Sequence, residues 1–286
     1  MEHFFVISNI LKDPHYKVAK QIQNYLKDHD KTCQIQEDCG KHTVRNYKYT
    51  DPSKVPENTD CVLVLGGDGT VLQASRDLVE RHIPLFGINM GTLGYLAEAG
   101  VDNINQELEK LMLDQCIFEE RMMLAGSAFR GSQKIFSDIA LNDIVIARSG
   151  RMRVSDFHIF VNGRFLNSYS ADGIIVSTPT GSTGYNLSAG GPIVAPAASM
   201  ILITPIAPHT LTARSVILPD DVKITIEIGQ RGENSEEAEA SFDGDTTVRM
   251  NSKDYIEIEK SGRTVCFAKT DQVSFLEILR RKMRGA

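Results

Sequence analysis

The glycine-rich segment Gly66-Gly67-Asp68-Gly69-Thr70 directly follows an uninterrupted apolar run at residues 61–65. Glycines let a backbone approach a ligand closely, and amide groups at the start of a helix favour anions. A carboxylate among phosphate-binding amides requires a bridging cation or faces a hydroxyl proton. The segment therefore indicates phosphoryl transfer to a hydroxyl group, with Asp68 as the base or orienting group. The alternative interpretation is a tight strand-to-helix turn without a ligand.

Two common nucleotide-binding motifs are excluded for this segment. The chain has no G-x-x-x-x-G-K-[ST] sequence, so the loop is not of the Walker type. The G-x-G-x-x-G pattern also fails, because Leu72 stands where the third glycine is required.

A second glycine-rich segment at residues 87–94 reads Gly-Ile-Asn-Met-Gly-Thr-Leu-Gly. Asn89 and Gly91 come just after a predicted strand at residues 83–88. Open parallel sheets bind ligands outside the carboxyl ends of their strands. We therefore expect Asn89 and Gly91 to line the same cleft as Asp68, and the alternative is an ordinary loop.

The most distinctive segment spans residues 172–191 and is rich in hydroxyl side chains. Six Ser or Thr residues, two glycines and Tyr185 occur between Ser177 and Ser188. Hydroxyl groups are uncharged donors and acceptors that suit ribose, amide and phosphate oxygens alike, so a ligand site is expected here. Asn142-Asp143 interrupts an apolar strand pattern with an amide and an acid. This pair suits a ribose diol or an adenine edge, and a β-bulge with a local hydrogen bond is the alternative.

These residues must be positioned by two different kinds of structure. The first third of the chain alternates short apolar runs with helical patterns, which predicts a parallel sheet with right-handed crossovers. Its expected strands are 3–8, 61–65 and 83–88, and its expected helices are 16–27, 70–81 and 104–113. After residue 120 strands dominate: 137–147, 157–161, 173–177, 222–228, 255–258 and 264–267. Asn162-Gly163 and Asp243-Gly244 predict hairpin turns, and helices are expected only at 195–202 and 274–284.

The expected fold is an α/β N-terminal domain with a parallel, Rossmann-like sheet, followed by a mostly β C-terminal domain. We place the first domain at residues 1–120, the β-rich domain at 121–267, and a tail at 268–286 that returns to the first domain. A length of 286 residues is compatible with two ordinary domains.

Composition restricts the classes of partner. The chain carries 31 Lys and Arg against 37 Asp and Glu, a formal net charge of −6, which argues against a basic surface for nucleic acid or anionic lipid. Its five cysteines are scattered without C-x-x-C spacing, so neither a disulfide framework nor a zinc knuckle is predicted. The N-terminus lacks the plan of a signal peptide and no segment reaches the roughly 20 apolar residues of a membrane span. We expect a cytoplasmic protein without nucleic-acid or membrane partners.

Taken together, the motifs resemble those of the bacterial NAD kinases. GGDGT at 66–70, N-x-G-x-L-G at 89–94, Asn142-Asp143 and D-G-x-x-x-S-T-P-T-G-S-T-G-Y at 172–185 occur in this order. GGDGT alone is shared with diacylglycerol and sphingosine kinases and resembles a phosphofructokinase motif. TPTGSTGY, followed by SAGGPI and then by Pro208-His-Thr-Leu, is highly specific to NAD kinases.

The resemblance implies roles for individual residues. Asp68 matches the family's catalytic aspartate. The positions implied in substrate or nucleotide binding are Gly67, Gly69, Asn89, Gly91, Asn142, Asp143, Ser170, Asp172, Thr183, Gly184, Tyr185, Asn186, Leu187, Ser188 and Ala207. Three positions depart from the family pattern: Asp143 replaces a frequent Glu, Ser170 an Arg of some members, and Asp245 the Gln of F-D-G-Q.

The implied reaction transfers the γ-phosphate of ATP, or the end of a polyphosphate, to the adenosine-ribose 2′-hydroxyl of NAD, which gives NADP. The implied cofactor is Mg²⁺ or another divalent metal carried with ATP, without a metal site of the protein's own, and the implied assembly is a homodimer or homotetramer. One alternative is a lipid kinase that shares GGDGT and would need an apolar substrate groove. The other is an NAD(P)-binding sensor without turnover, against which the intact Asp68 argues.

Overall fold

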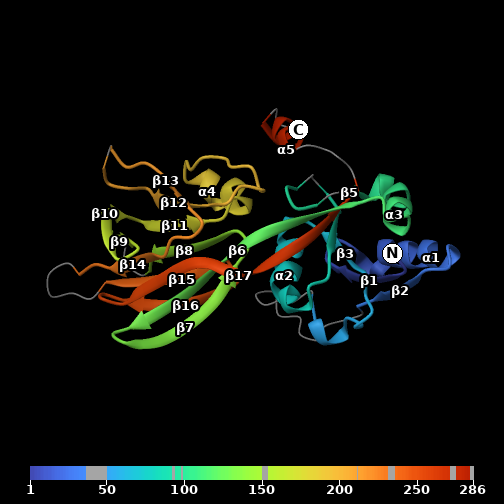
Figure 1. Ribbon diagram of the computed structural model, residues 1–286, viewed down its shortest axis with the longest axis horizontal. Coiled ribbons are helices and arrows are strands. Elements are labelled where there is room, and N and C mark those ends of the chain that lie inside the picture. Colours follow the sequence, from blue (N-terminus) through green and yellow to red (C-terminus); the bar gives the residue numbers. More distant parts are fainter. Residues whose placement is uncertain are drawn as a thin grey trace. The chain divides into compact units, whose positions relative to one another are not determined.

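A computed structural model describes residues 1–36, 50–91, 94–97, 99–149, 154–210, 212–230, 236–270 and 275–283. The chain divides into two compact units (Figure 1). The N-terminal unit comprises Met1–Glu120 and Val265–Ala286, and the β-rich unit comprises Arg121–Thr264. Two long strands, β6 (Ile117–Arg130) and β17 (Tyr255–Lys269), have residues in both units.

A parallel sheet forms the centre of the N-terminal unit, with the strand order β2-β1-β3-β4. Its strands are β1 (His3–Ser8), β2 (Thr32–Ile35), β3 (Cys61–Gly66) and β4 (Leu85–Asn89). Every residue of β3 is buried, as expected for an apolar strand covered on both faces. β4 also pairs in parallel with β5 (Ala99–Gly100) and, through Leu85 and Phe267, with β17. The predicted α/β class of this unit is confirmed.

The strand order reverses between β1 and β3, because the chain first moves from β1 to β2 and later from β3 to β4. Ligands of open α/β sheets bind at such a switch point, outside the carboxyl ends of the strands. The residues that follow β1 and β3 therefore occupy the position that this class of fold uses for binding.

Helices cover the parallel sheet (Figure 1). They are α1 (Lys17–Asp28), α2 (Asp68–Asp77) and α3 (Ile104–Met112). The described chain of this unit also contains the 3-10 turns η1 (Pro14–Tyr16), η2 (Pro52–Lys54), η3 (Val79–Arg81) and η4 (Val101–Asn103), and helix α5 (Phe275–Met283), which comes after β17 in the sequence. α1 buries Ala19, Ile22 and Leu26, whose spacing of three and four residues puts them on one face. The helix expected at 70–81 begins two residues earlier and ends at Asp77, before η3. Among the helices that the structure describes, none combines the length and apolar character needed to cross a membrane.

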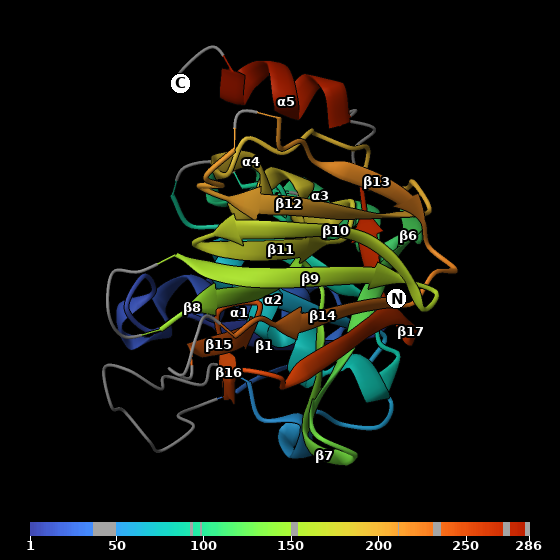
Figure 2. The ribbon, with the colours of Figure 1, turned by 90° about the vertical axis from the view of Figure 1, so that its left-hand side faces the viewer.

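Antiparallel strands dominate the β-rich unit, which confirms its predicted class. One sheet has the order β13-β12-β11-β8-β15-β16, and β10-β9-β14-β17 and β6-β7 form further antiparallel pairings (Figure 2). The bounds are β7 (Gln133–Ala140), β8 (Asp143–Arg148), β9 (Ser155–Val161), β10 (Arg164–Ala171), β11 (Gly173–Ser177), β12 (Met200–Ile206), β13 (Val216–Pro219), β14 (Ile224–Ile228), β15 (Glu237–Phe242) and β16 (Thr246–Asn251). Two short helices, η5 (Thr180–Thr183) and α4 (Tyr185–Ser188), follow β11.

Both predicted hairpin turns are confirmed. Asn162 and Gly163 join β9 to β10 with φ values of 50° and 74°. Asp243 and Gly244 join β15 to β16 with φ values of 53° and 72°. Positive φ at both central positions matches the right-handed twist of the paired strands, and Asn, Asp and Gly tolerate it best.

Three expected elements differ from the structure. The helix predicted at 195–202 is wrong, because Met200–Ile206 is strand β12 and pairs with β11 and β13. The single strand expected at 137–147 is two strands, β7 and β8, which are separated by Leu141 and Asn142. The strands expected at 255–258 and 264–267 are one continuous strand, β17.

Candidate active site

Asp68 is the first residue of α2, directly after the N-cap residue Gly67. Its Oδ2 atom accepts a hydrogen bond from the Tyr95 amide at 2.8 Å, and its Oδ1 atom accepts one from the Leu96 amide at 3.1 Å. A Cβ atom on Gly94 would lie 1.8 Å from Asp68 Oδ1, so this approach requires glycine at position 94. The segment after β4 thus fixes the carboxylate, and the structure brings the two glycine-rich segments together.

The residues after β1 join the same arrangement. The Asn9 amide donates to the Leu65 carbonyl at 2.9 Å, and Asn9 Nδ2 donates to Thr70 Oγ1 at 3.2 Å. The Met90 amide donates to the Gly66 carbonyl at 2.8 Å. The loops that follow β1, β3 and β4 are therefore linked by hydrogen bonds at the carboxyl edge of the sheet.

The glycines of the first loop have different roles. A Cβ atom on Gly66 would lie 2.3 Å from Thr70 Oγ1, so packing alone requires this glycine. A Cβ atom on Gly69 would meet nothing within 4 Å, and Gly69 has no positive φ. A tight turn alone therefore does not account for glycine at position 69, whereas close approach of a ligand to the backbone does.

Asn89 and Gly91 contact each other at the end of β4. Asn89 Nδ2 donates to the Gly91 carbonyl at 2.8 Å. Asn89 is 6% exposed, and its Oδ1 atom is buried without a hydrogen-bond partner in the part of the chain that the structure describes. A buried carbonyl oxygen without a partner is costly, so this atom is available to a donor or a cation that enters with a ligand.

In the β-rich unit, the Asp243 carboxylate organises the backbone of the Asn142-Asp143 pair. It accepts hydrogen bonds from the amides of Leu141, Asn142 and Asp143 at 2.7, 2.8 and 3.0 Å. The Asp243 amide donates in return to the Asp143 carbonyl at 3.0 Å. This turn fixes the break between β7 and β8 and so fixes the position of both side chains.

Asp143 is buried and carries an unusual proton affinity. Burial raises the pKa of its carboxyl from 3.8 to about 7, and the negative charge of Asp243 adds to this rise. Asp143 therefore exchanges its proton near neutral pH. It can accept hydrogen bonds when ionised and donate one when protonated.

The hydroxyl-rich segment packs on the same pair. A Cβ atom on Gly184 would lie 3.8 Å from Asp143 Oδ2 and 3.9 Å from Asn142 Nδ2. A Cβ atom on Gly181 would lie 2.1 Å from the Asn142 carbonyl oxygen, so glycine is required there. The structure thus brings Asn142, Asp143 and Gly184 together within the β-rich unit.

Several polar groups of this segment bind within the protein. Thr178 Oγ1 donates to the Leu141 carbonyl at 2.6 Å, and Ser182 Oγ donates to the Val194 carbonyl at 3.1 Å. Thr183 Oγ1 lies 3.4 Å from the Thr180 carbonyl, to which it donates. Asn186 is fully buried, donates to the carbonyls of Ser182 and Pro192, and accepts from Thr204. These groups hold η5 and α4 in place.

Other residues of α4 are open to solvent. Tyr185 is 47% exposed and Leu187 is 39% exposed, and Ser188 is also exposed. Buried Asn186 anchors α4 to the interior of the unit, so the exposed Tyr185, Leu187 and Ser188 lie on a rigid turn. Their placement is compatible with contact to a nucleotide, which stays a prediction.

The remaining predicted residues lie at strand ends of the β-rich unit. Asp172 Oδ1 accepts a hydrogen bond from Arg148 Nε at 2.6 Å. Ser170 Oγ donates to the Asp156 carboxylate, and the Ser170 carbonyl accepts from the His209 amide at 2.8 Å. Ala207 follows β12 with a φ of 43°, and Asp245 is exposed in the turn between β15 and β16.

Comparison with known proteins identifies the family. Residues 4–116 match the family model of the ATP-NAD kinase N-terminal domain, and residues 141–270 match that of the ATP-NAD kinase C-terminal domain. The NAD kinase of Lachnospira eligens is 45% identical over 293 residues, covering 99% of this chain and 100% of the relative. The NAD kinase of Agathobacter rectalis is 44% identical and covers 99% of both chains. The chain belongs to the NAD kinase family.

Solved structures agree with this family. The yeast NADH kinase, solved with NADH, has the same fold, with a TM-score of 0.84, 23% identity, and coverage of 100% of this chain and 88% of that one. The NAD kinase of Archaeoglobus fulgidus, solved with ATP, gives a TM-score of 0.76 at 27% identity and covers 98% of this chain and 99% of that one. The chain is thus an enzyme of the NAD kinase type, and the lipid kinase interpretation is not supported.

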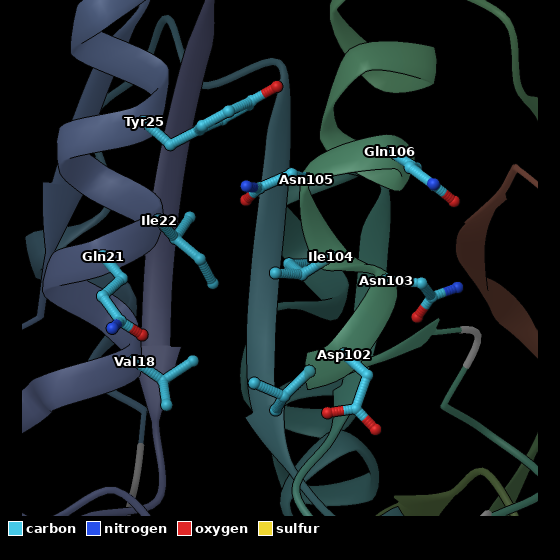
Figure 3. A pocket seen from close by; sticks show the side chains of 10 residues that line it. Val18, Gln21, Ile22, Tyr25, Asp102, Asn103, Ile104, Asn105 and Gln106 are labelled. Atoms are coloured by element: carbon cyan, nitrogen blue, oxygen red, sulfur yellow. The ribbon is translucent and has the colours of Figure 1, made fainter.

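A cavity of about 480 Å³ between α1 and α3 contains none of the predicted site residues (Figure 3). Side chains of both helices face each other across it, among them Gln21, Tyr25, Asn105 and the apolar Ile22 and Ile104. Its lining offers Asp102 as the one carboxylate. The residues that line the cavity do not include those of the loops around Asp68, so the cavity has no part in the proposed kinase site.

Two contributors to the site are not identified by sequence patterns. Asp243 is predicted only as part of a hairpin turn, although its carboxylate binds three amides about 100 residues away. The amides of Tyr95 and Leu96, which fix Asp68, carry no side-chain signal at all. The glycine at position 94 is the one trace in the sequence of the close approach of Asp68.

Proposed function

We propose that this chain transfers the γ-phosphate of ATP to the 2′-hydroxyl of the adenosine ribose of NAD, which yields NADP. The observation that carries the proposal is the carboxylate of Asp68, held between two backbone amides among glycines at the carboxyl edge of a parallel sheet. Such an edge binds phosphates through backbone amides. Membership of the NAD kinase family supplies the substrate class.

In this proposal Asp68 accepts or orients the proton of the ribose hydroxyl. Two amide hydrogen bonds fix the direction of the carboxylate and leave further lone pairs free to accept the hydroxyl. Phosphoryl transfer needs little covalent catalysis by the protein, so positioning of the reactants and stabilisation of charge supply most of the rate enhancement. The proposed contribution of Asp68 is therefore a carboxylate held in a fixed position to accept or orient the hydroxyl proton.

The donor atoms at this edge suit a Mg²⁺ ion that arrives with ATP. Magnesium prefers oxygen ligands and usually binds through one or two carboxylates together with substrate phosphates. Asp68 offers one carboxylate, and Asn89 Oδ1 is a buried oxygen without a partner in the described chain. No cluster of three or more His, Cys, Asp or Glu side chains able to hold a metal occurs among the described residues. When bound, the ion would be held mainly by the phosphates of ATP and would neutralise the triphosphate, while Asp68 faces the ribose hydroxyl.

The β-rich unit is proposed to bind the nucleotide of NAD. Asn142 and Asp143 offer an amide and a carboxyl whose backbone is fixed by Asp243. Tyr185 presents an exposed ring next to Gly184, and rings of this kind stack on bases. Asp172 is held by Arg148 and offers a further acceptor for a ribose or amide group.

We also infer a homodimer or homotetramer that acts in the cytoplasm. β10 and β13 are edge strands, and Phe165 and Ile217 on them are exposed apolar side chains. Edge strands with apolar side chains favour association. The described cysteines Cys33, Cys61, Cys116 and Cys266 are free, which suits a reducing compartment. Light scattering of the purified chain tests the assembly, and a monomer at micromolar concentration would contradict it.

The activity test uses the purified full chain with ATP, Mg²⁺ and NAD, coupled to an NADP-specific dehydrogenase. NADP formation is the expected result. Parallel reactions replace ATP with polyphosphate, or replace NAD with diacylglycerol or sphingosine. If no phosphoryl donor yields NADP, the proposed function is wrong, and if only a lipid is phosphorylated, the lipid kinase interpretation is correct.

A further inference from the structure

Lys12 lies close to both glycine-rich segments, although it belongs to neither motif. A Cβ atom on Gly67 would be 2.9 Å from Lys12 Nζ, and one on Gly91 would be 4.0 Å from it. Gly67 is the N-cap of α2, and Gly91 follows β4. The ammonium group therefore lies beside the α2 N-terminus and the end of β4, at the edge where the strand order reverses.

Hydrogen bonds of the residues before and after Lys12 in the sequence fix its backbone. The Lys12 amide donates to the Asn9 carbonyl at 2.9 Å, and the Leu11 amide donates to Asn9 Oδ1 at 3.0 Å. Asp13 accepts hydrogen bonds from the amides of Val18 and Ala19 at the start of α1. This short segment is thereby held between β1 and α1, and the Lys12 side chain extends over the glycines from a fixed origin.

Two acids close to Lys12 or to the glycine-rich loops, Asp13 and Asp68, accept hydrogen bonds from other groups. Asp13 also accepts from Ser8 Oγ at 2.9 Å, and both oxygens of Asp68 accept backbone amides. Within the part of the chain that the structure describes, no carboxylate forms a salt bridge with Lys12. Its ammonium thus faces glycine backbone as a cation available to an anion.

We propose that Lys12 binds a phosphate oxygen of the phosphoryl donor at this edge. The proposal rests on the proposed kinase function and adds a residue to its donor site. Backbone amides of the GGDGT loop and one ammonium group would then share the charge of the phosphates. Hydrogen bonds between an ammonium and a phosphate are about twice as strong as neutral ones. The ligand is assigned to the donor because Lys12 Nζ lies beside the two glycine-rich loops that resemble a phosphate cradle.

The experiment compares three variants of the full chain. Lys12→Met removes the charge, Lys12→Arg keeps it, and Lys27→Met is the matched control. Lys27 is an exposed lysine in the last turn of α1, a helix that begins at residue 17, so it lies about 15 Å along the helix from the Lys12 end. Steady-state kinetics with ATP and NAD varied separately gives kcat and both KM values for each variant.

For Lys12→Met we expect KM for ATP to rise about tenfold or more, because one charge-assisted hydrogen bond is lost. KM for NAD should change less than twofold, Lys12→Arg should recover most of the loss, and Lys27→Met should match the wild type. Equal effects of Lys12→Met and Lys27→Met on KM for ATP would overturn the proposal. An increase in KM for NAD as large as the increase in KM for ATP would also overturn the proposal.

A binding measurement separates this proposal from the proposed function. Calorimetric titration of each variant with ATP and Mg²⁺ reports donor binding without turnover. If the wild type binds ATP but forms no NADP, the kinase function fails while Lys12 is still tested by its effect on binding. Unchanged ATP affinity of Lys12→Met would contradict the role of Lys12 even if the wild type makes NADP.

Discussion

Asp68 and Asp243 both accept hydrogen bonds from backbone amides, but the two carboxylates have different roles. Asp68 accepts two amides and is oriented by them, whereas Asp243 accepts three and orients the segment that carries Asn142 and Asp143. Backbone amides are rigid donors, so a carboxylate that they bind has little freedom to rotate. Each site in the two units therefore depends on a carboxylate whose position is set by main chain from another part of the fold.

Replacement of Asp68 by Asn tests its role in the reaction. The amide has nearly the same size but lacks the negative charge, and its NH₂ group would face one of the two backbone N–H donors. We expect kcat for NADP formation to fall about 10²- to 10⁴-fold, the usual contribution of a general base. Affinity for NAD, measured by calorimetry, should stay within about threefold.

Asp102→Asn is the control for this substitution, because Asp102 lies at the cavity between α1 and α3 in the same unit. It should keep the activity of the wild type. Near-normal turnover of Asp68→Asn would show that Asp68 is not the base or orienting group.

The raised pKa of Asp143 predicts a pH dependence of stability. Its carboxyl has a pKa of about 7 in the folded chain against 3.8 ordinarily, so the folded state holds this proton more tightly than the unfolded state. Its contribution to stability is thus full below about pH 4 and is lost as the pH rises toward 7. The slope from this group is at most about 1.4 kcal/mol per pH unit.

Urea unfolding between pH 5 and pH 8 measures this slope. Asp143→Asn mimics the protonated acid, so it should gain stability over the wild type as the pH rises. Asp245→Asn changes an exposed acid of the neighbouring turn and should keep the wild-type slope. Parallel stability curves for the wild type and Asp143→Asn across this range would contradict the prediction.

At the scale of elements, the site of the N-terminal unit depends on three loops that meet at one edge of the sheet. The loop after β1 bonds to the loop after β3 through Asn9, and the loop after β4 bonds to it through Met90 and the Asp68 carboxylate. Small changes in the third loop should therefore displace the Asp68 carboxylate.

Gly94→Ala tests this coupling. The new Cβ atom would lie 1.8 Å from Asp68 Oδ1, so the carboxylate must move. We expect kcat/KM to fall at least about tenfold, because displacement of a catalytic group by about 1 Å costs up to two orders of magnitude. Gly100→Ala is the control, since its Cβ atom would make an ordinary contact of 3.7 Å. Equal activity of the two variants would show that the loop after β4 does not position Asp68.

The elements also show where sequence patterns suffice and where they fail. β3 and the start of α2 are predictable because a long apolar run and a glycine cluster are local signals. Residues 195–202 contain alanines that favour a helix, yet pairing with β11 and β13 makes Met200–Ile206 a strand. Lys12 and Asp243 act through contacts with residues far away in the sequence. Such contacts are set by topology and leave no periodic signal.

At the scale of the whole molecule, a net charge of −6 coexists with a site proposed for a triphosphate and a dinucleotide. The proposed site needs no broad basic surface, because the groups proposed for the phosphates are glycine amides, hydroxyls and Lys12, which lies near Gly67. The N-terminal unit has one apolar core and the β-rich unit another. Each group of predicted site residues thus has a rigid support of its own.

The overall charge predicts that the chain does not bind nucleic acid while it binds ATP. Nonspecific binding to DNA depends on many lysine and arginine contacts to phosphates, and proteins that have them bind with Kd values of about 10⁻⁴–10⁻⁶ M at physiological salt and more tightly at low salt. Fluorescence anisotropy with a labelled 20-base-pair duplex in 50 mM salt should show no binding at 10 μM chain. Under the same conditions calorimetry should detect ATP. Saturable binding of the duplex below 10 μM would reveal a basic surface that the summed charge conceals, and it would remove the argument that excludes nucleic-acid partners.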